Sequence, residues 1–320
     1  MLSFEKFNYW YRPAKQIERR LIIDALLRLS ECGDYPISAY TYFGFGSIYY
    51  VDFVMFHKYL SIKKMICCES ENIPKRMKFN KPYRFISLKM NKASDVIPYL
   101  AFSSKYFVWL DYEKTLDKEV LEDVSQLCRS LRPGSILLIT MDADEDRSPE
   151  EIEDELLSQS ERRKQKLEYY QANFQRFTKT PIINQSLDEP RLPKFFSEVV
   201  YSRIEEVLAG RGGVNFFPLF NFLYADNAQM LTLGGIIDGD EGAARLQTSG
   251  IYGHDFIRRR YQSLKITAPP LTLRERYWLD KKIGHQLRNN RLPFELRRRG
   301  SLKSYAKFYK HYPIFSEILV

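Results

Sequence analysis

The sequence has few cysteines, and their spacing matches neither a metal site nor a disulfide framework. The 320 residues include four cysteines, Cys32, Cys67, Cys68 and Cys128, with no C-x-x-C spacing. Two of them are adjacent within an apolar run, where free cysteine usually packs as a small hydrophobic residue. The pattern excludes a disulfide-rich secreted scaffold and favours a cytoplasmic protein with reduced thiols.

The chain also lacks a long apolar segment. The longest uncharged stretch, residues 35–51, carries five tyrosines, two glycines and a proline, whereas a membrane span needs about 20 mostly apolar residues. The N-terminus has no apolar region or small-residue cleavage site of a secretory signal. Glycine and proline, 15 of each, are too few for a collagen-like or low-complexity chain. We therefore expect a folded protein without a membrane association.

Acidic residues are scarce in the last part of the chain. Residues 251–320 hold 16 lysines and arginines against 5 acidic residues, whereas the first 250 residues hold 33 against 35. Aromatic residues lie between these cations, which suits nucleic acid because phosphates attract cations and rings stack on bases. An acidic protein partner also fits, including the acidic residues 142–155 of a second copy in a homo-oligomer. The two arginine clusters are Arg258, Arg259, Arg260 and Arg297, Arg298, Arg299.

Short apolar segments alternate with helical patterns in the first half of the chain. Such alternation predicts parallel pairing through right-handed crossovers, and hence a doubly wound α/β sheet. Strands are expected at 38–45, 64–68, 84–89, 106–110 and 135–140, with helices at 48–60, 73–78, 93–100 and 117–131. Two further apolar segments, 216–224 and 230–237, predict an antiparallel hairpin that makes the sheet mixed.

Three units follow from this pattern. Residues 1–34 contain an amphipathic helix that is expected to pack on the core. Residues 35–240 are the central domain, with a charged helical insertion at about 145–192. Residues 241–320 are a basic, helical C-terminal extension. Helices in the insertion and beyond are expected at 150–174, 195–208, from Thr272 and at 302–309.

Candidate binding residues follow the predicted strands, because open parallel sheets bind ligands beyond the carboxyl ends of their strands. Gly44 and Gly46 precede a helix and let the backbone approach a ligand. Glu69 ends the second strand, 23 residues beyond Gly46, where an acidic group can accept hydrogen bonds from both ribose hydroxyls. Asp111 ends the fourth strand. These positions predict a nucleoside-type ligand.

The order of the elements resembles that of class I S-adenosylmethionine-dependent methyltransferases, in which five alternating strands precede an antiparallel hairpin. The resemblance covers residues 12–240 and implies a Rossmann-like fold, S-adenosylmethionine as cofactor, and methyl transfer to oxygen or nitrogen. The stretches that are similar to a prokaryotic O-methyltransferase group are RPAKQIERR, YFGFGSIYYVDFVMFHKYL, VWLDYEKTLDKEVLEDV, GSILLIT and FNFLYADNAQMLTLGGIID.

The resemblance also implies roles for individual residues. It implies a catalytic pair and a set of cofactor contacts, and no metal ligands. The implied positions are Gly44, Gly46 and Ser47 under the methionine part, Glu69 at the ribose, Met90 and Asn91 near the adenine, and Asp111 with Tyr112 facing the methyl group.

Two positions depart from the family's glycine motif. Tyr42 stands where the family has an acidic residue, and Ile48 replaces the third glycine. The first change removes a contact to the cofactor's amino group, and the second narrows the loop. They leave open an alternative: a catalytically inactive, regulatory protein that keeps the fold and acts with a nucleic acid or protein partner. A nicotinamide dehydrogenase is disfavoured, because the terminal hairpin differs from the six-strand order of those enzymes.

Overall fold

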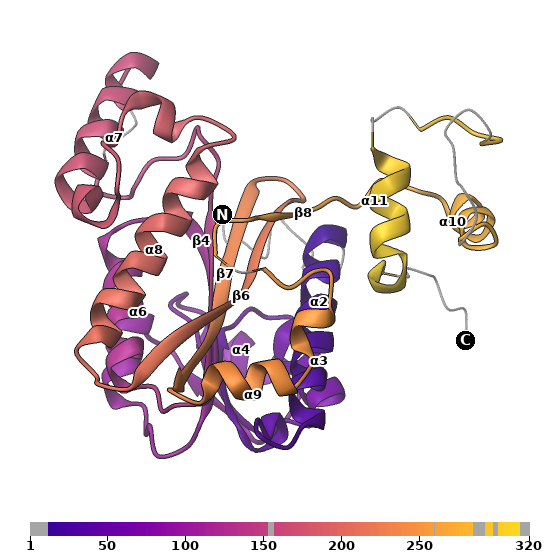
Figure 1. Cartoon of the computed structure of the whole chain (residues 1–320), viewed down its shortest axis with the longest axis horizontal. Helices are drawn as coiled ribbons and strands as arrows, with labels where there is room; N and C mark the ends of the chain where they lie inside the picture. Colours follow the sequence, from indigo (N-terminus) through magenta and orange to yellow (C-terminus); the bar gives the residue numbers. More distant parts are fainter. Residues whose placement is uncertain (1–11, 153–156, 259, 284–291, 297–299, 314–320) are drawn as a thin grey trace.

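One mixed sheet with helices on both faces forms the centre of the protein (Figure 1). The computed structural model describes residues 12–152, 157–258, 260–283, 292–296 and 300–313. Its eight strands are β1 (Thr41–Phe45), β2 (Lys64–Cys68), β3 (Ile86–Lys89), β4 (Tyr106–Thr115), β5 (Ser135–Asp142), β6 (Val214–Ala225), β7 (Gln229–Gly239) and β8 (Leu264–Ile266).

The strand order β3-β2-β1-β4-β5-β7-β6-β8 confirms the predicted Rossmann-like mixed sheet. Strands β1 to β5 pair in parallel, and β7 is antiparallel to both β5 and β6. The chain order reverses between β1 and β4, because β2 and β3 lie on one side of β1 and the later strands on the other. This switch point is where open α/β sheets bind their ligands.

The helices form two layers that bury separate hydrophobic clusters. One cluster lies under α2, α3, α4, α9 and the C-terminal helices, and the other under α5 to α8. The α-helices are α2 (Pro13–Glu31), α3 (Val51–Leu60), α4 (Pro74–Asn80), α5 (Ala93–Val96), α6 (Lys118–Ser130), α7 (Gln159–Phe174), α8 (Leu192–Ala209), α9 (Gly242–Thr248), α10 (Leu273–Asp280) and α11 (Ser301–Phe308). Short 3-10 helices are η2 (Ile37–Ala39), η3 (Ile97–Tyr99), η4 (Gln175–Phe177), η5 (Asn184–Leu187), η6 (Ile251–Gly253) and η8 (Tyr309–His311).

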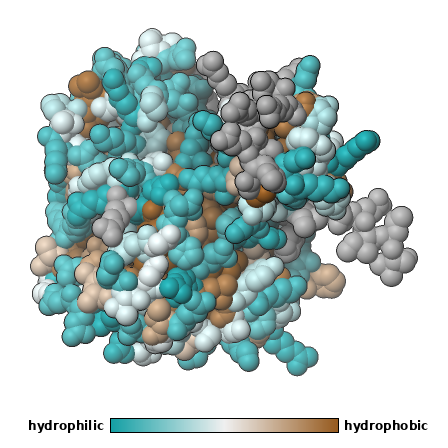
Figure 2. All heavy atoms as spheres, turned by 45° about the vertical axis from the view of Figure 1, so that its right-hand side comes forward, coloured by the Kyte–Doolittle hydropathy of each residue, from teal (hydrophilic) through white to brown (hydrophobic). Residues whose placement is uncertain are grey.

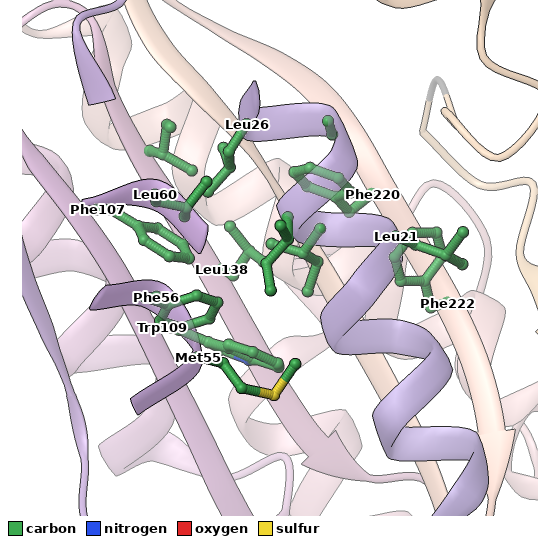
Figure 3. Close-up of a cluster of buried hydrophobic side chains, with 14 of the residues drawn as sticks. Leu21, Leu26, Met55, Phe56, Leu60, Phe107, Trp109, Leu138, Phe220 and Phe222 are labelled. Carbon is green, nitrogen blue, oxygen red and sulfur yellow. The ribbon is translucent and has the colours of Figure 1, made fainter. Parts of the chain in front are cut away.

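Helix α2 lies across one face of the sheet and closes the first cluster. Its apolar residues recur at the spacing of one helix face, and Leu21 and Leu26 are buried against the sheet. Figure 3 shows these two side chains over a group that includes Leu138 and Phe220 of the strands. The helix is therefore part of the core, and its charged residues on this face are carried into the interior.

Three boundaries differ from the sequence prediction. Helix α7 begins at Gln159, because Ser158 and Glu161 form a capping box that starts the helix there. Strand β4 continues past Asp111 to Thr115, with a register shift between these two residues. Strand β8, which the sequence did not predict, pairs in parallel with β6.

The C-terminal segment is attached to the core at several points. The His311 Nε2 atom lies 2.6 Å from Asp24 Oδ2 of α2, and the buried Arg276 guanidinium donates to the backbone oxygen of Pro313 at 2.6 Å. Hydrophilic residues cover most of the face that Figure 2 shows, with hydrophobic residues visible between them. Within the described residues, no helix has the length and apolar composition needed to cross a membrane.

Candidate functional site

A cavity of about 420 Å³ lies at the carboxyl ends of the first four strands. Most small-molecule sites have a volume of about 300–1,000 Å³, so the cavity is large enough for a nucleoside cofactor. The cavity brings together most of the residues that the sequence singled out. Those that line it are Gly46, Ser47, Glu69, Asn91, Asp111 and Tyr112.

Two of the predicted contact residues, Gly44 and Met90, do not line this cavity. A Cβ atom on Gly44 would lie 2.4 Å from the Tyr42 hydroxyl oxygen and 3.0 Å from the Trp109 carbonyl oxygen. Gly44 is therefore required by close packing inside the sheet. Met90 is half-buried and packs against the cluster under α2 and α3. Their predicted cofactor contacts find no support in this geometry.

Tyr42 explains the departure from the acidic motif position. Its side chain is buried, with its ring centroid 5.0 Å from that of Phe53 and 5.2 Å from that of Phe107. The residue at this position thus contributes to the hydrophobic core and does not reach the cavity. Any acidic group that meets the ligand must come from another element.

Glu69 is such a group. It follows β2, lines the cavity, and its Oε1 atom accepts a hydrogen bond from the backbone N–H of Glu71 at 3.0 Å. Burial raises the pKa of Glu69 to about 7, although this hydrogen bond acts in the opposite direction. Near neutral pH the empty site therefore holds Glu69 partly protonated. A ligand that donates hydrogen bonds to the carboxylate would favour its ionised form.

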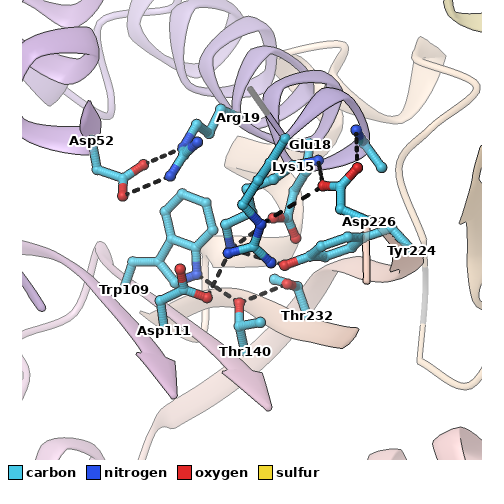
Figure 4. A network of polar contacts seen from close by, with 12 residues as sticks. Lys15, Glu18, Arg19, Asp52, Trp109, Asp111, Thr140, Tyr224, Asp226 and Thr232 are labelled. Carbon is cyan, nitrogen blue, oxygen red and sulfur yellow. Dashed lines mark hydrogen bonds and ion pairs between the residues drawn. The ribbon is translucent and has the colours of Figure 1, made fainter. Parts of the chain in front are cut away.

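Asp111 ends in an ion pair with a buried lysine of α2 (Figure 4). The Lys15 Nζ atom lies 2.7 Å from Asp111 Oδ1 and donates to the Tyr224 hydroxyl oxygen at 3.0 Å. It also lies 4.4 Å from the ring centroid of Trp109. Burial acts to raise the pKa of Asp111, but the nearby Lys15 ammonium outweighs it and lowers that pKa. Asp111 is therefore ionised at the floor of the cavity.

Glu18 is a second acidic partner of Lys15. Both side chains are fully buried, and Lys15 Nζ lies 3.0 Å from Glu18 Oε2. Burial raises the pKa of Glu18, although Lys15 acts to lower it. The lysine is thus shared between an ionised Asp111 and a Glu18 that binds a proton more tightly than usual. These contacts make Lys15 the centre of the polar network under the cavity.

The hydroxyl of Tyr112 points to a buried carboxylate on α6. It donates a hydrogen bond to Asp123 Oδ2 at 2.6 Å, and both residues line the cavity. Burial raises the pKa of Tyr112 well above its usual value. This tyrosine is therefore a neutral donor engaged with Asp123. Its predicted pairing with Asp111 in catalysis stays a prediction.

A second, smaller cavity of about 40 Å³ adjoins Gly46 and Ser47 on the α2 side. An ion pair lines it: the Arg19 Nε atom lies 2.6 Å from Asp52 Oδ1, and the Nη2 atom lies 3.3 Å from Asp52 Oδ2. Asp111 lines both cavities. The two spaces therefore border the same strand end, one with a guanidinium and one with several carboxylates.

One acidic group in the described part of the chain has the spacing of metal ligands: Asp117, Glu119 and Glu150. The Lys114 ammonium already lies among them, 2.7 Å from Asp117 Oδ2 and in contact with Glu119. Burial acts to lower the pKa of Lys114, but its bonds to these two carboxylates outweigh burial and raise it. A lysine thus occupies the place that a metal cation would take.

The basic C-terminal clusters are only partly within the described residues, since Arg259 and Arg297–Arg299 lie outside them. Arg260 pairs with Glu205, and Arg258 donates to the backbone oxygen of Asp255 at 2.7 Å. These two arginines therefore have structural partners. The predicted polyanion or acidic-protein partner and the homo-oligomer stay predictions.

The strand order, the antiparallel β7 and the cavity at the switch point together define a Rossmann-like methyltransferase fold. The chain belongs to the family described as "Putative O-methyltransferase", whose model matches residues 7–320. No curated protein matches the sequence.

Several solved structures are similar to this chain at low sequence identity. The N-methyltransferase NodS from Bradyrhizobium japonicum WM9 is 10% identical over 69% of this chain and 97% of its own, with a TM-score of 0.35. The spermidine synthase from Thermotoga maritima is 9% identical over 75% and 67%, with a TM-score of 0.36. An O-methyltransferase family protein from Burkholderia thailandensis is 12% identical over 69% and 60%, with a TM-score of 0.32.

The sequence interpretation missed Lys15, Arg19 and Asp123. Lys15 and Arg19 are four residues apart on the face of α2 that also carries Ile22 and Leu26. Charges on the apolar face of a helix signal buried ion pairs, because an unpaired buried charge is too costly. Asp123 gave no such signal, because its partner Tyr112 is on a different element.

The pKa of Glu69 gives a test of the cavity by pH. If the ligand's hydroxyls need the ionised carboxylate, affinity for S-adenosylhomocysteine should rise with pH through about 7. Between pH 6 and pH 8 we expect about a tenfold gain, since the ionised fraction rises by that factor. Calorimetric titration at both pH values measures it. The Glu69→Gln variant, which cannot ionise there, should lose this dependence, and an equal pH dependence in the variant would remove Glu69 from the site.

Proposed function

We propose that the protein is an S-adenosylmethionine-dependent methyltransferase that acts on an oxygen or nitrogen atom of its acceptor. One observation carries this proposal: the cavity of about 420 Å³ gathers residues that follow four consecutive parallel strands. Membership of an O-methyltransferase family supports the same function. Glu69 would accept hydrogen bonds from the ribose, and the backbone at Gly46 and Ser47 would lie along the methionine part.

The cavity's charge fits a positively charged nucleoside. Glu69, Asp111 and Asp123 all line it, and each carries a carboxyl group. Burial raises the pKa of Glu69 to about 7 and that of Asp123 to about 6, so neither has a cation that offsets its burial. A cationic ligand would relieve this cost, because an opposite charge favours the ionised form of a carboxyl group.

The second cavity fits the amino-acid end of the same cofactor. The Arg19 guanidinium lies beside Ser47 and can attract a carboxylate, while Asp52 and Asp111 can attract an ammonium group. An α-amino acid carries both charges at neutral pH. These residues would replace the acidic group that Tyr42 no longer supplies, so the altered motif need not weaken cofactor binding.

Bound S-adenosylmethionine supplies a methyl group on a positively charged sulfur. Transfer mainly requires an acceptor atom held in line with the carbon–sulfur bond at about 3–3.5 Å. Asp111 is suited to accept a hydrogen bond from the acceptor, because it is ionised at the cavity floor. Its lowered pKa makes it a weak proton acceptor, so its role is to orient the acceptor more than to remove a proton.

Asp111→Asn separates cofactor binding from transfer. The variant should bind S-adenosylhomocysteine within about threefold of the wild type, while turnover falls about 100-fold, since small errors in acceptor position cost about that much. Glu18 remains as the acidic partner of Lys15 in this variant. Isotopically methyl-labelled S-adenosylmethionine and fractionated cell extract measure the transfer.

The same assay decides between an enzyme and a regulatory protein. Label in an extract component that depends on wild-type protein supports the methyltransferase. Binding of the cofactor without transfer to any fraction, including RNA, DNA and protein, would favour the inactive regulatory alternative. Failure to bind either S-adenosylmethionine or S-adenosylhomocysteine would contradict both.

A further inference from the structure

Asp123 has one carboxylate oxygen without a partner. The side chain projects from α6, is 1% exposed and lines the cavity. Its Oδ2 atom accepts the Tyr112 hydroxyl at 2.6 Å, whereas Oδ1 has no hydrogen-bond partner among the residues that the structure describes. Buried polar atoms are nearly always hydrogen-bonded, and an exception calls for an explanation. A ligand with an N–H or O–H group would supply the missing donor.

The surroundings of Asp123 suit a flat, weakly polar ring. Cys68 and Ala93 line the same cavity, and both are small and buried. Asn91 lies beside them, and its backbone oxygen accepts from the Cys68 thiol at 3.1 Å. This wall therefore offers small side chains next to one buried acceptor atom.

The other end of the site has the opposite character. The space next to Ser47 is bordered by the Arg19–Asp52 ion pair. Charged groups suit the amino-acid end of the cofactor, and small buried side chains suit its base. With the ribose at Glu69 between them, the base extends toward α5 and α6, where Asp123 lies.

We propose that Asp123 recognises the exocyclic amino group of the cofactor's adenine and so selects an amino-purine over a 6-oxo-purine. This inference rests on the proposed cofactor. The amino group would donate to Oδ1, while Tyr112 holds Oδ2 and fixes the orientation of the carboxylate. A hypoxanthine base presents a carbonyl oxygen at this position, which repels a carboxylate. Asp123 is thus a specificity-determining residue on a helix outside the glycine motif.

The test compares two ligands that differ at this one group. S-adenosylhomocysteine and its deaminated analogue, S-inosylhomocysteine, are titrated calorimetrically at pH 8, where Asp123 is ionised because its pKa is about 6. The wild type should bind the adenine ligand at least about tenfold more tightly, because a hydrogen bond to a charged group is lost with the oxo base. Equal affinity for the two ligands overturns the proposal without any variant.

The Asp123→Asn variant should narrow or invert this preference. Its amide oxygen can still accept from Tyr112, which leaves the amide nitrogen as a donor toward the base. Tyr112→Phe removes the hydroxyl but keeps the carboxylate, so the preference for adenine should remain. Glu122→Gln, on the exposed face of the same helix, is the matched control and should keep the wild-type ratio.

The outcomes separate this inference from the proposed function. An Asp123→Asn variant that binds S-adenosylhomocysteine with an unchanged preference would show that Asp123 does not read the base. It would leave the cofactor proposal standing. A wild-type protein that binds neither ligand contradicts the cofactor proposal, and this inference falls with it.

Discussion

Replacing Lys15 by methionine is expected to destabilise the protein by about 3–5 kcal/mol, the range for breaking one side of a buried ion pair. The substitution leaves the ionised Asp111 without its cation at 2.7 Å, next to the fully buried Glu18. Chemical denaturation followed by circular dichroism measures the loss. Arg28→Met on the same helix removes an exposed pair with Glu31 and should cost less than about 1 kcal/mol.

A double variant tests the cause of this loss. In Lys15→Met/Asp111→Asn no ionised carboxylate remains at that position, and the raised pKa of Glu18 keeps a proton on its carboxyl group more readily. We expect most of the lost stability to return. If the double variant is no more stable than Lys15→Met, the loss comes from packing and not from the uncompensated charge.

The same ion pair makes stability depend on acid. The pKa of Asp111 is lowered in the folded protein. Its contribution is therefore present above the unfolded pKa of about 3.8 and is lost as the pH falls through the folded value. Acid should thus weaken the attachment of α2 to the sheet.

Glu69→Ala is expected to weaken S-adenosylhomocysteine binding by about 1.5–3 kcal/mol, or about 10- to 150-fold, the range for hydrogen bonds to a charged group. The reason is that Glu69 is the carboxylate that follows β2 on the cavity wall and faces the proposed ribose. Calorimetric titration at pH 8 measures the change. Glu31→Ala, on an exposed residue of α2, should leave the affinity unchanged.

A stability measurement guards this interpretation. Loss of a half-buried carboxyl group whose pKa burial has raised should not destabilise the fold, because its ionised form is costly there. A Glu69→Ala variant with wild-type melting temperature and wild-type affinity would exclude Glu69 from ligand binding. A variant that unfolds would instead point to a structural role.

The sheet could be predicted from sequence because each parallel strand is a short apolar run followed by a helix. The positions of Glu69 and Asp111 followed from the same pattern, since the carboxyl ends of neighbouring parallel strands meet at one edge. The interior of the site could not be predicted in this way. Lys15 meets Asp111 across 96 positions of sequence, and no local pattern encodes that contact.

The glycine motif shows a second limit of sequence patterns. A Cβ atom on Gly46 would lie 2.3 Å from the Cys67 sulfur. Glycine is thus required there by the packing of β1 against β2 as well as by any ligand. A motif residue can be explained by the core, so the motif alone does not establish a binding site. The start of α7 likewise depends on one local capping box at Ser158, which overrides a longer helical pattern.

Strand β8 changes what the C-terminal segment is to the rest of the protein. It hydrogen-bonds along Phe222–Tyr224 of β6, which would otherwise be the last strand of the sheet. Further along β6, Pro218 and a register shift interrupt the outer edge. Bare, regular edges pair with strands of other molecules and lead to aggregation. The C-terminal segment therefore serves as edge protection, and a chain that ended before Leu264 would leave the last turn of β6 open to its neighbours.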